Sequence, residues 1–345
     1  MSIGKVAALA GVSPTTVGRV INNERNVSPE TVLKIRKIMR EVGYVPKPPA
    51  LRRGRKRVED TPLKHGVVAL LVHGKDLPIV MSSPIAGLVF HGVESALAER
   101  GLSMVQGSLS ADRTLLPPMV TKGQVDGVVV WPHLNGLPDE IVEALRPYPV
   151  VYLMSGQEER LPGDRVRANN FRIGQMASQY LISKQHHSIA YLAPATFQIN
   201  LWDRARGFHA FAQQAGAMAQ DVYLDFLGGD DLLDLGTQGD EIIEQNLIEL
   251  FQSQQKPTGL FVTCDALTAK MYPILKKMGI HLGSDVEVVS CNHEISLLAG
   301  LDPLPASIDI RGESIGRRAV EQLIWRTKNP ATDGFTVIEI EPQLA

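Results

Sequence analysis

Side chains that could read DNA occur in a short run near the start of the sequence. Thr15 and Thr16 can donate to a phosphate or touch a thymine methyl, and Arg19 can form a bidentate pair with a guanine. Ser13 is typical of a helix N-cap and Pro14 of a first helical turn, so a helix is predicted to begin here. This run therefore favours recognition of phosphates and base edges by the first turns of a helix.

Two amphipathic helices are predicted to position this run. Apolar residues recur at helical spacing over residues 3–10, Ser2 can cap that segment, and Gly11 follows where a helix end favours a left-handed residue. The helix that begins after Ser13 has its own buried side, formed by Val17, Val20 and Ile21. Two short helices joined by a tight turn with a glycine have the sequence form of a helix-turn-helix, although any small helical domain has such faces.

A third helix completes this N-terminal unit. It is predicted to start at Ser28-Pro29-Glu30 and to end at Gly43, with an apolar stripe formed by Val32, Ile35, Met39 and Val42. Five runs within residues 2–46 closely resemble, in order and spacing, the headpiece of the LacI/GalR family of bacterial transcription regulators. These runs are Ala-Leu-Ala-Gly-Val-Ser, Thr-Val, Arg-Val-Ile-Asn, Val-Ser-Pro-Glu-Thr and Gly-Tyr-Val-Pro.

The resemblance implies which residues of this headpiece contact DNA. It places five residues at the start of a recognition helix in the major groove, namely Ser13, Pro14, Thr15, Thr16 and Arg19. Many relatives have a base-reading residue at the position of Pro14, so part of the readout is expected to lie with Thr15 and Arg19. The expected DNA-binding set also includes Ser2, Asn22, Asn26 and Tyr44.

Charge is divided unevenly along the 345 residues. Residues 1–57 hold 13 Lys and Arg against 3 Asp and Glu, whereas the remaining residues hold 22 against 34. A basic head on an acidic body fits a protein with one end that binds nucleic acid and a body that avoids it.

Residues 47–63 are predicted to form a basic linker rich in proline and arginine. Relatives usually have a short hinge helix here, whose leucine wedges into the minor groove. In this chain Leu51 is the one candidate wedge, and Arg53 occupies the place usually held by the leucine. Two alternatives stay open: a hinge helix, or an extended arm whose arginines, Arg52, Arg53 and Arg55, enter a narrow A·T minor groove.

Residues 64–345 alternate between short apolar strands and amphipathic helices, which is typical of parallel sheets covered by helices on both faces. This length exceeds one comfortable core, so two lobes are predicted. The segment resembles the LacI/GalR effector domain, of the periplasmic-binding-protein type. The expected fold is thus a small all-α helix-turn-helix domain, residues 1–46, followed by α/β with two doubly wound parallel-sheet lobes. By resemblance the N-lobe spans about 64–157 plus 293–322, and the C-lobe about 162–290 plus 323–345.

The cleft between two such lobes is expected to bind a small-molecule effector. The resemblance rests on Ser83-Pro84-Ile85, Arg204-Ala-Arg-Gly-Phe and other short runs, and it implies that Arg204 grips the effector through its guanidinium fork. Phe171 and Trp202 could stack on a sugar face, although aromatic residues beside a helix are more often core. The expected effector-binding set is Ser83, Ile85, Met154, Phe171, Trp202, Arg204, Asp265 and Asn292.

Two of these positions, and Cys264 beside Asp265, depart from the family pattern. Relatives often have an Asn-Asp pair where this chain has Cys264-Asp265, and many have an aspartate in place of Asn292. Met154 replaces another frequent polar ligand. The pocket is therefore expected to hold a less hydroxylated or modified ligand, or nothing.

The sequence argues against several other classes of protein. Adjacent His186 and His187 point in different directions on a helix or a strand, and no catalytic motif occurs, so no metal, no cofactor and no enzyme activity is predicted. Two cysteines are too few for a disulfide framework and fit a reducing cytoplasm. We expect no signal peptide and no membrane span, because no apolar run approaches 18 residues.

The sequence predicts a cytoplasmic transcriptional repressor that binds a near-palindromic operator as a homodimer and responds to a carbohydrate-like effector. Two alternatives remain. One is a ligand-independent DNA-binding dimer with a degenerate pocket, and the other is a sugar-binding protein without regulatory output.

Overall fold

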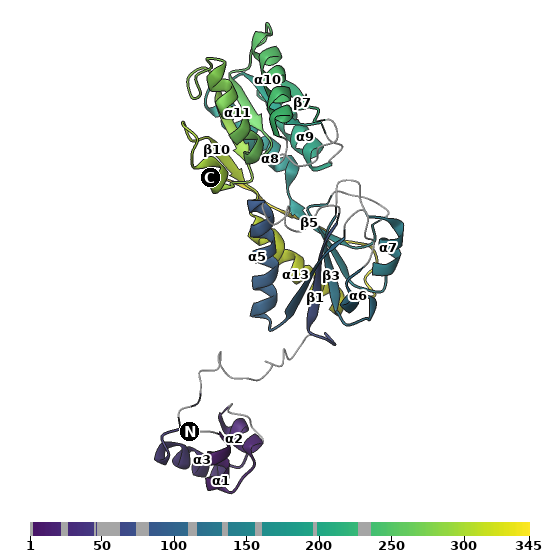
Figure 1. The fold of residues 1–345 in the computed structure, drawn as a ribbon, viewed down its shortest axis with the longest axis vertical. Coiled ribbons are helices and arrows are strands. Elements are labelled where there is room, and N and C mark those ends of the chain that lie inside the picture. The colour runs from purple at the N-terminus through teal and green to yellow at the C-terminus, as the bar shows by residue number, and fades with distance from the viewer. Residues whose placement is uncertain are drawn as a thin grey trace. The chain divides into compact units, whose positions relative to one another are not determined.

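The computed structural model of the protein describes residues 3–21, 27–44, 46, 63–73, 83–109, 116–132, 137–155, 161–195, 199–226 and 236–345. The chain divides into two compact units, Met1–Arg57 and Val58–Ala345 (Figure 1).

The N-terminal unit, called the headpiece below, contains three helices: α1 (Ile3–Ala10), α2 (Pro14–Ile21) and α3 (Pro29–Glu41). The three helices pack around a small hydrophobic core formed by Val6, Ala7, Ala10, Val17, Val20 and Ile35. Gly11 and Gly43 have φ of 67° and 63°, so both helix ends use the left-handed conformation that glycine adopts without strain. The three helices predicted from the sequence are confirmed.

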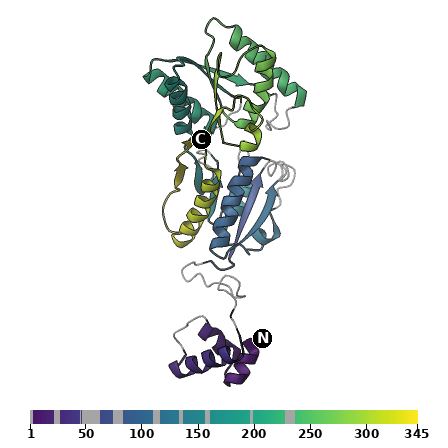
Figure 2. The ribbon, with the colours of Figure 1, turned by 90° about the vertical axis from the view of Figure 1, so that its left-hand side faces the viewer.

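The larger unit contains two six-stranded sheets, visible side-on in Figure 2. The first sheet has the order β11-β5-β4-β3-β1-β2, and its paired strands are parallel. Its strands are β1 (Val67–His73), β2 (Ser103–Leu109), β3 (Gly127–Trp131), β4 (Val150–Leu153), β5 (Asp164–Ala168) and β11 (Val337–Ile340). One face packs on α5 (Pro84–Glu99) and α13 (Gly312–Lys328), and the other on α6 (Pro118–Thr121) and α7 (Asp139–Leu145).

The second sheet has the order β12-β10-β9-β8-β6-β7 and is parallel except for the pair β10–β12. Its strands are β6 (Ser188–Pro194), β7 (Met218–Leu224), β8 (Gly259–Val262), β9 (Glu287–Cys291), β10 (Ala306–Asp309) and β12 (Gln343–Leu344). One face packs on α8 (Asn170–Ser183) and α9 (Ile199–Gln214), and the other on α10 (Gly236–Gln252) and α11 (Asp265–Lys277). A short helix, α12 (Ile295–Leu298), follows β9.

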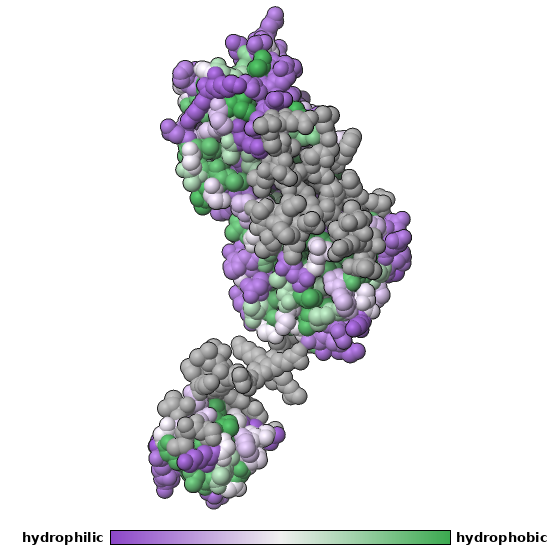
Figure 3. Space-filling model, in the orientation of Figure 1, coloured by the Kyte–Doolittle hydropathy of each residue, from purple (hydrophilic) through white to green (hydrophobic). Residues whose placement is uncertain are grey.

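The end of the second lobe that carries α10 and α11 is covered largely by hydrophilic residues in the view of Figure 3. Two ion pairs join these helices, Lys270–Asp240 at 3.3 Å and Lys277–Glu244 at 2.8 Å. This end is therefore a solvated surface.

The doubly wound architecture with two parallel-sheet lobes is confirmed, but the expected lobe boundaries differ from the structure. Strand β5 belongs to the first sheet rather than the C-lobe, and β10 belongs to the second sheet rather than the N-lobe. Helix α13 packs on the first sheet throughout its length, and β11 also returns there. The chain therefore passes between the sheets after β5, after β10 and after β11. Strands β5 and β10 each pair with the preceding strand of their own sheet before the chain leaves that sheet.

Candidate DNA-binding surface and effector site

The start of α2 presents the hydroxyl and guanidinium groups singled out from the sequence. Ser13 caps the helix, because its Oγ accepts from the N–H of Thr16 at 3.1 Å and lies 2.9 Å from Thr16 Oγ1. Thr15 and Arg19 are exposed, whereas Val17 and Val20 are buried against the other helices. The local geometry thus turns Thr15 and Arg19 outward on a fixed helical scaffold.

The remaining residues of the expected DNA-binding set are placed in part. Tyr44 is half-buried just after α3, and its N–H donates to the carbonyl of Met39 at 2.9 Å. Pro14 is exposed in the first turn of α2. The other members lie outside the described residues: Ser2, Asn22, Asn26, Leu51, Arg52, Arg53 and Arg55.

Arg204 lies buried in α9, with 6% of its surface exposed. Its Nε donates to Asn170 Oδ1 at 2.9 Å, and one Nη donates to the carbonyl of Thr263, directly after β8, at 2.6 Å. These two bonds hold the guanidinium plane at the carboxyl end of the second sheet. Both acceptors are neutral, and no carboxylate among the described residues forms an ion pair with Arg204.

Two asparagines that the sequence analysis missed connect Arg204 to the first lobe. Asn170 Nδ2 donates to Asn200 Oδ1 at 3.0 Å, and Asn200 Nδ2 donates to the carbonyl of Met154 at 2.7 Å. Met154 follows β4 with φ of 53°, a left-handed conformation that is uncommon outside glycine. The expected effector residue Met154 thus contributes its backbone carbonyl to a hydrogen-bonded chain between the lobes.

Asp265 is fully buried, and its carboxylate is engaged within the second lobe. It accepts from the hydroxyls of Ser290 and Ser307, the latter at 3.0 Å, and from the N–H of Glu294 at 2.6 Å. Burial raises the pKa of this carboxyl above its ordinary value. This arrangement favours a role in positioning the ends of β9 and β10 over the direct effector contact expected from the sequence.

Asn292 and Ile85 meet at Glu294, another residue that the sequence analysis missed. The Glu294 carboxylate accepts from the N–H of Ile85, in the first turn of α5, at 3.0 Å and from Asn292 Nδ2 at 3.2 Å. Burial raises its pKa. Ser83 is half-buried at the N-cap position of α5 and makes no side-chain capping bond. The only sequence signal for Glu294 was its place just beyond a strand end.

Phe171 and Trp202 are 38% and 54% exposed. They lie near the starts of α8 and α9, the two helices that carry Asn170 and Arg204. The alternative that these aromatic side chains are core residues is therefore wrong, because both rings are accessible.

Two families match this chain. The family described as "Bacterial regulatory proteins, lacI family" matches residues 2–47, and the "Periplasmic binding protein-like domain" matches residues 178–345. The chain thus combines a LacI-family DNA-binding domain with a periplasmic-binding-protein-like domain. The first match covers the three headpiece helices, and the second covers most of the second lobe together with α13 and β11.

Several LacI-family proteins are similar along nearly the whole chain. The ribose operon repressor of Escherichia coli is 26% identical, covering 94% of this chain and 92% of the repressor. The transcriptional regulator CelR of Thermobifida fusca is 27% identical, and the match covers 96% of this chain and 94% of CelR. Among solved structures, a CelR–cellobiose complex has a TM-score of 0.62 at 24% identity, covering 100% of this chain and 98% of the other. The structure of a lac repressor dimer bound to operator and the anti-inducer ONPF has a TM-score of 0.61 at 19% identity. The match covers 100% of this chain and 97% of the other. At these identities the structures show a shared fold.

The described residues of this chain contain no group of three or more side chains suited to hold a metal ion. Within the same ranges, no helix is long and apolar enough to cross a bilayer. The named relatives are regulators rather than enzymes.

Proposed function

We propose that this protein is a sequence-specific DNA-binding transcriptional repressor whose operator affinity is controlled by a small-molecule effector. The observation that carries the proposal is the start of α2, where Ser13 fixes the helix and Thr15 and Arg19 are turned outward from a buried core. The repressors and regulators similar over the whole chain support it. A sugar-binding protein without regulatory output would have no use for this surface.

Replacing Arg19 with alanine is expected to cost roughly 1–3 kcal/mol of operator discrimination, about 5–150-fold, because a bidentate contact to guanine is lost. The measurement is the ratio of dissociation constants for an operator, selected from a random duplex library, and for its scrambled version. Lys5→Ala is the matched control, since it removes the same charge from an exposed position of α1. A wild-type ratio in the Arg19→Ala protein would exclude base reading by this side chain.

The proposed effector is a sugar or sugar derivative bound by Arg204, with Phe171 and Trp202 beside it. The support is the buried guanidinium held by neutral acceptors, together with two accessible aromatic rings on the same two helices, α8 and α9. The similarity to a ribose operon repressor and to a cellobiose-bound regulator makes ribose and cellobiose the first probes. A coupling of about 1–3 kcal/mol between the effector and DNA would change operator affinity 5–150-fold.

Arg204→Lys is expected to weaken binding of a sugar probe by roughly tenfold or more, because lysine cannot reproduce the planar fork of donors. Calorimetry with ribose and cellobiose measures the loss, and the exposed neighbour Arg206→Lys is the control. If neither sugar, nor a wider panel, binds a wild-type protein that still binds its operator, the alternative of a ligand-independent DNA-binding dimer is favoured.

We further propose residues 1–46 as the DNA-binding headpiece, 47–63 as the linker and 64–345 as the effector-binding and dimerisation domain. A C2 homodimer would present two α2 helices to half-sites about 34 Å apart, so the operator should be near-palindromic. The proposed site of action is the cytoplasm, where the operator is.

A further inference from the structure

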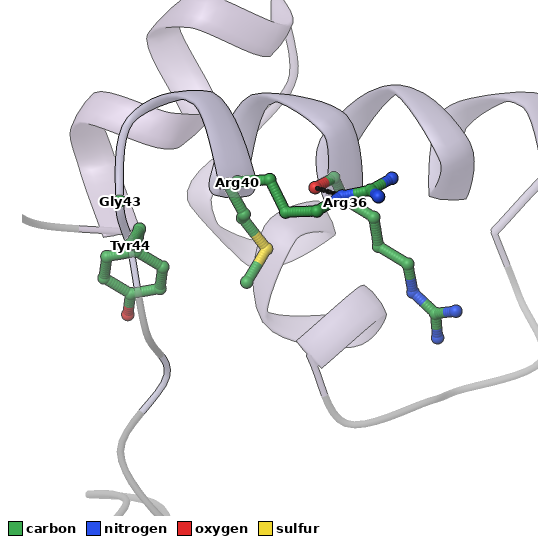
Figure 4. Close-up of a pocket in the computed structure, with 5 residues that line it drawn as sticks. Arg36, Arg40, Gly43 and Tyr44 are labelled. Atoms are coloured by element: carbon green, nitrogen blue, oxygen red, sulfur yellow. Dashed lines mark hydrogen bonds between the residues drawn. The ribbon is translucent and has the colours of Figure 1, made fainter.

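A hollow on the headpiece is lined by Arg36, Met39, Arg40, Gly43 and Tyr44 (Figure 4). One polar contact in it, from Arg40 Nε to the carbonyl of Arg36 at 3.4 Å, is internal to α3. The hollow belongs to the headpiece, so it does not contribute to the contacts between the two lobes of the larger unit. One of those contacts, at Glu294, joins residues that are expected to bind the effector from opposite lobes.

Helix α5 of the first lobe begins without a capping group of its own. Ser83 stands at the N-cap position but makes no side-chain capping bond, and the first turn of α5 has no acidic residue. The first N–H groups of a helix have no acceptor within it, and the helix N-terminus has a partial positive charge. Helix α8 differs, because Asn169 Oδ1 accepts from the N–H of Arg172 at 3.0 Å and caps it locally. The start of α5 therefore favours a negatively charged acceptor from elsewhere in the fold.

Glu294 of the second lobe supplies this acceptor. Its Oε1 accepts from the N–H of Ile85, in the first turn of α5, at 3.0 Å, and its Oε2 accepts from Asn292 Nδ2 at 3.2 Å. Glu294 is 4% exposed, and within the described ranges no lysine, arginine or histidine forms an ion pair with it. Because its charge is buried among neutral donors, the carboxylate depends on the helix start of the other lobe.

The segment that presents Glu294 is fixed firmly to the second lobe. Asn292 and His293 have φ of 104° and 59°, which costs free energy for residues other than glycine. The three successive N–H groups of residues 292–294 donate, in order, to the carbonyl of Ile308 at 2.9 Å, to Ser307 Oγ at 3.0 Å and to Asp265 Oδ2 at 2.6 Å. A movement of the lobes apart should therefore break the bond between Glu294 and Ile85 before it deforms this segment.

We propose that Glu294 is a positioning residue that holds the two lobes together by capping α5 across the proposed effector site. The inference rests on the proposed function. A contact made in one arrangement of the lobes and lost in another shifts the population toward the first. In the arrangement that Glu294 holds, Ile85 and Asn292 are brought together from opposite lobes. Glu294 therefore raises the fraction of molecules that are ready to bind effector, and it does so through Ile85.

Amide hydrogen exchange of the full chain tests the cap without any ligand. In Glu294→Ala the N–H of Ile85 loses its acceptor, so its exchange should accelerate roughly tenfold or more. The N–H of Arg172 is the internal control, because its cap is local to α8, and it should exchange at the wild-type rate. Glu140→Ala removes an exposed carboxylate from the first turn of α7 and should leave both rates unchanged. A wild-type rate at Ile85 in Glu294→Ala would overturn the proposal.

Calorimetry with ribose and cellobiose tests the consequence for the effector. Glu294→Ala should weaken binding of the sugar that the wild type binds by about fivefold or more, because fewer molecules have the lobes in place. Glu294→Gln should lose less, since its amide oxygen can still accept from Ile85. A merely structural role would lower the urea midpoint and leave the sugar affinity of the folded protein unchanged, and that result would also overturn the proposal. Absence of sugar binding by the wild type would instead remove the proposed effector, while exchange at Ile85 would still decide whether Glu294 caps α5.

Discussion

Replacing Arg326 with alanine is expected to destabilise the first lobe by about 3–5 kcal/mol, because it leaves a buried carboxylate without its counter-charge. Asp164 is fully buried, and one Nη of Arg326 lies 2.5 Å from its Oδ1, while Nε lies 2.9 Å from Oδ2. Arg326 also donates to the carbonyls of Thr332 and Gly334. One side chain therefore joins α13, β5 and the approach to β11. Urea unfolding followed by far-UV circular dichroism measures the loss.

Two variants test the reason for this loss. Arg318→Ala, also on α13, removes a half-exposed arginine paired with Glu321 and should change stability little. Arg326→Met combined with Asp164→Leu removes both charges and should recover much of the lost stability. If Arg326→Ala costs no more than Arg318→Ala, the buried pair does not hold the first lobe together.

The Asp164–Arg326 pair also makes the stability of the protein depend on pH. Burial raises the pKa of Asp164, but hydrogen bonds from Arg326, Gln322 and the N–H of Thr336 outweigh it and hold the pKa below its ordinary value. A depressed pKa in the folded state contributes stability above the unfolded pKa, about 3.9, and this contribution is lost as pH falls through the folded value. In Arg326→Ala the largest opposing group is gone and the folded-state pKa of Asp164 rises, so this carboxyl should cost less stability on acidification than it does in the wild type.

The three helices of the headpiece could be predicted because their signals are local. Ser13-Pro14 and Ser28-Pro29 start helices, and Gly11 and Gly43 end them, through bonds within a few residues. No distant partner is needed to place Thr15 and Arg19 on the outside of α2.

The points at which the chain passes from one sheet to the other could not be predicted from such local signals. Strand β5 contains Asp164, Arg165 and Arg167, which resemble a solvated segment yet are all buried in the structure. Their burial depends on residues far along the chain, including Arg326 and Glu339, which lies 2.7 Å from Arg167. A strand stabilised by distant charges has no apolar run to reveal it, so the residues themselves could not correct the lobe boundary that the resemblance implied at this point.

The proposed effector site also depends on contacts between residues that are far apart in the sequence. The motif around Arg204 identified the arginine, but its acceptor Asn170 and the bridging residue Asn200 become visible only when α8 and α9 are packed together. Asp265 has the right residue type and position for a ligand contact, and only the structure shows that both its oxygens are engaged.

Gly174→Ala is expected to lower the stability of the protein strongly, because Gly174 lies where α8 packs against α9. A Cβ added at Gly174 would lie 1.8 Å from the carbonyl oxygen of Arg204 and 2.6 Å from the N of Phe208. The contact is reciprocal, because a Cβ at Gly207 would lie 1.9 Å from the carbonyl oxygen of Phe171. The helices touch backbone to backbone, so alanine must separate them, and we expect a loss of at least about 3 kcal/mol of unfolding free energy.

Gly87→Ala on α5 is the matched control for that variant. A Cβ at Gly87 meets nothing within 4 Å, so the same substitution should stabilise the protein by about 0.5–1 kcal/mol through helix propensity. The two substitutions should thus shift urea unfolding in opposite directions. If Gly174→Ala is neutral, the close helix contact does not exist in solution.

The Gly174→Ala variant also links packing to the proposed effector site. Separation of α8 from α9 moves Arg204 away from Asn170, whose Oδ1 accepts its Nε at 2.9 Å. A variant that remains folded at low temperature should therefore bind a sugar probe more weakly than the wild type. Its headpiece core lies in a separate compact unit, so binding to a random duplex should be unchanged. Loss of DNA binding without loss of sugar binding would show that this helix contact does not set the geometry around Arg204.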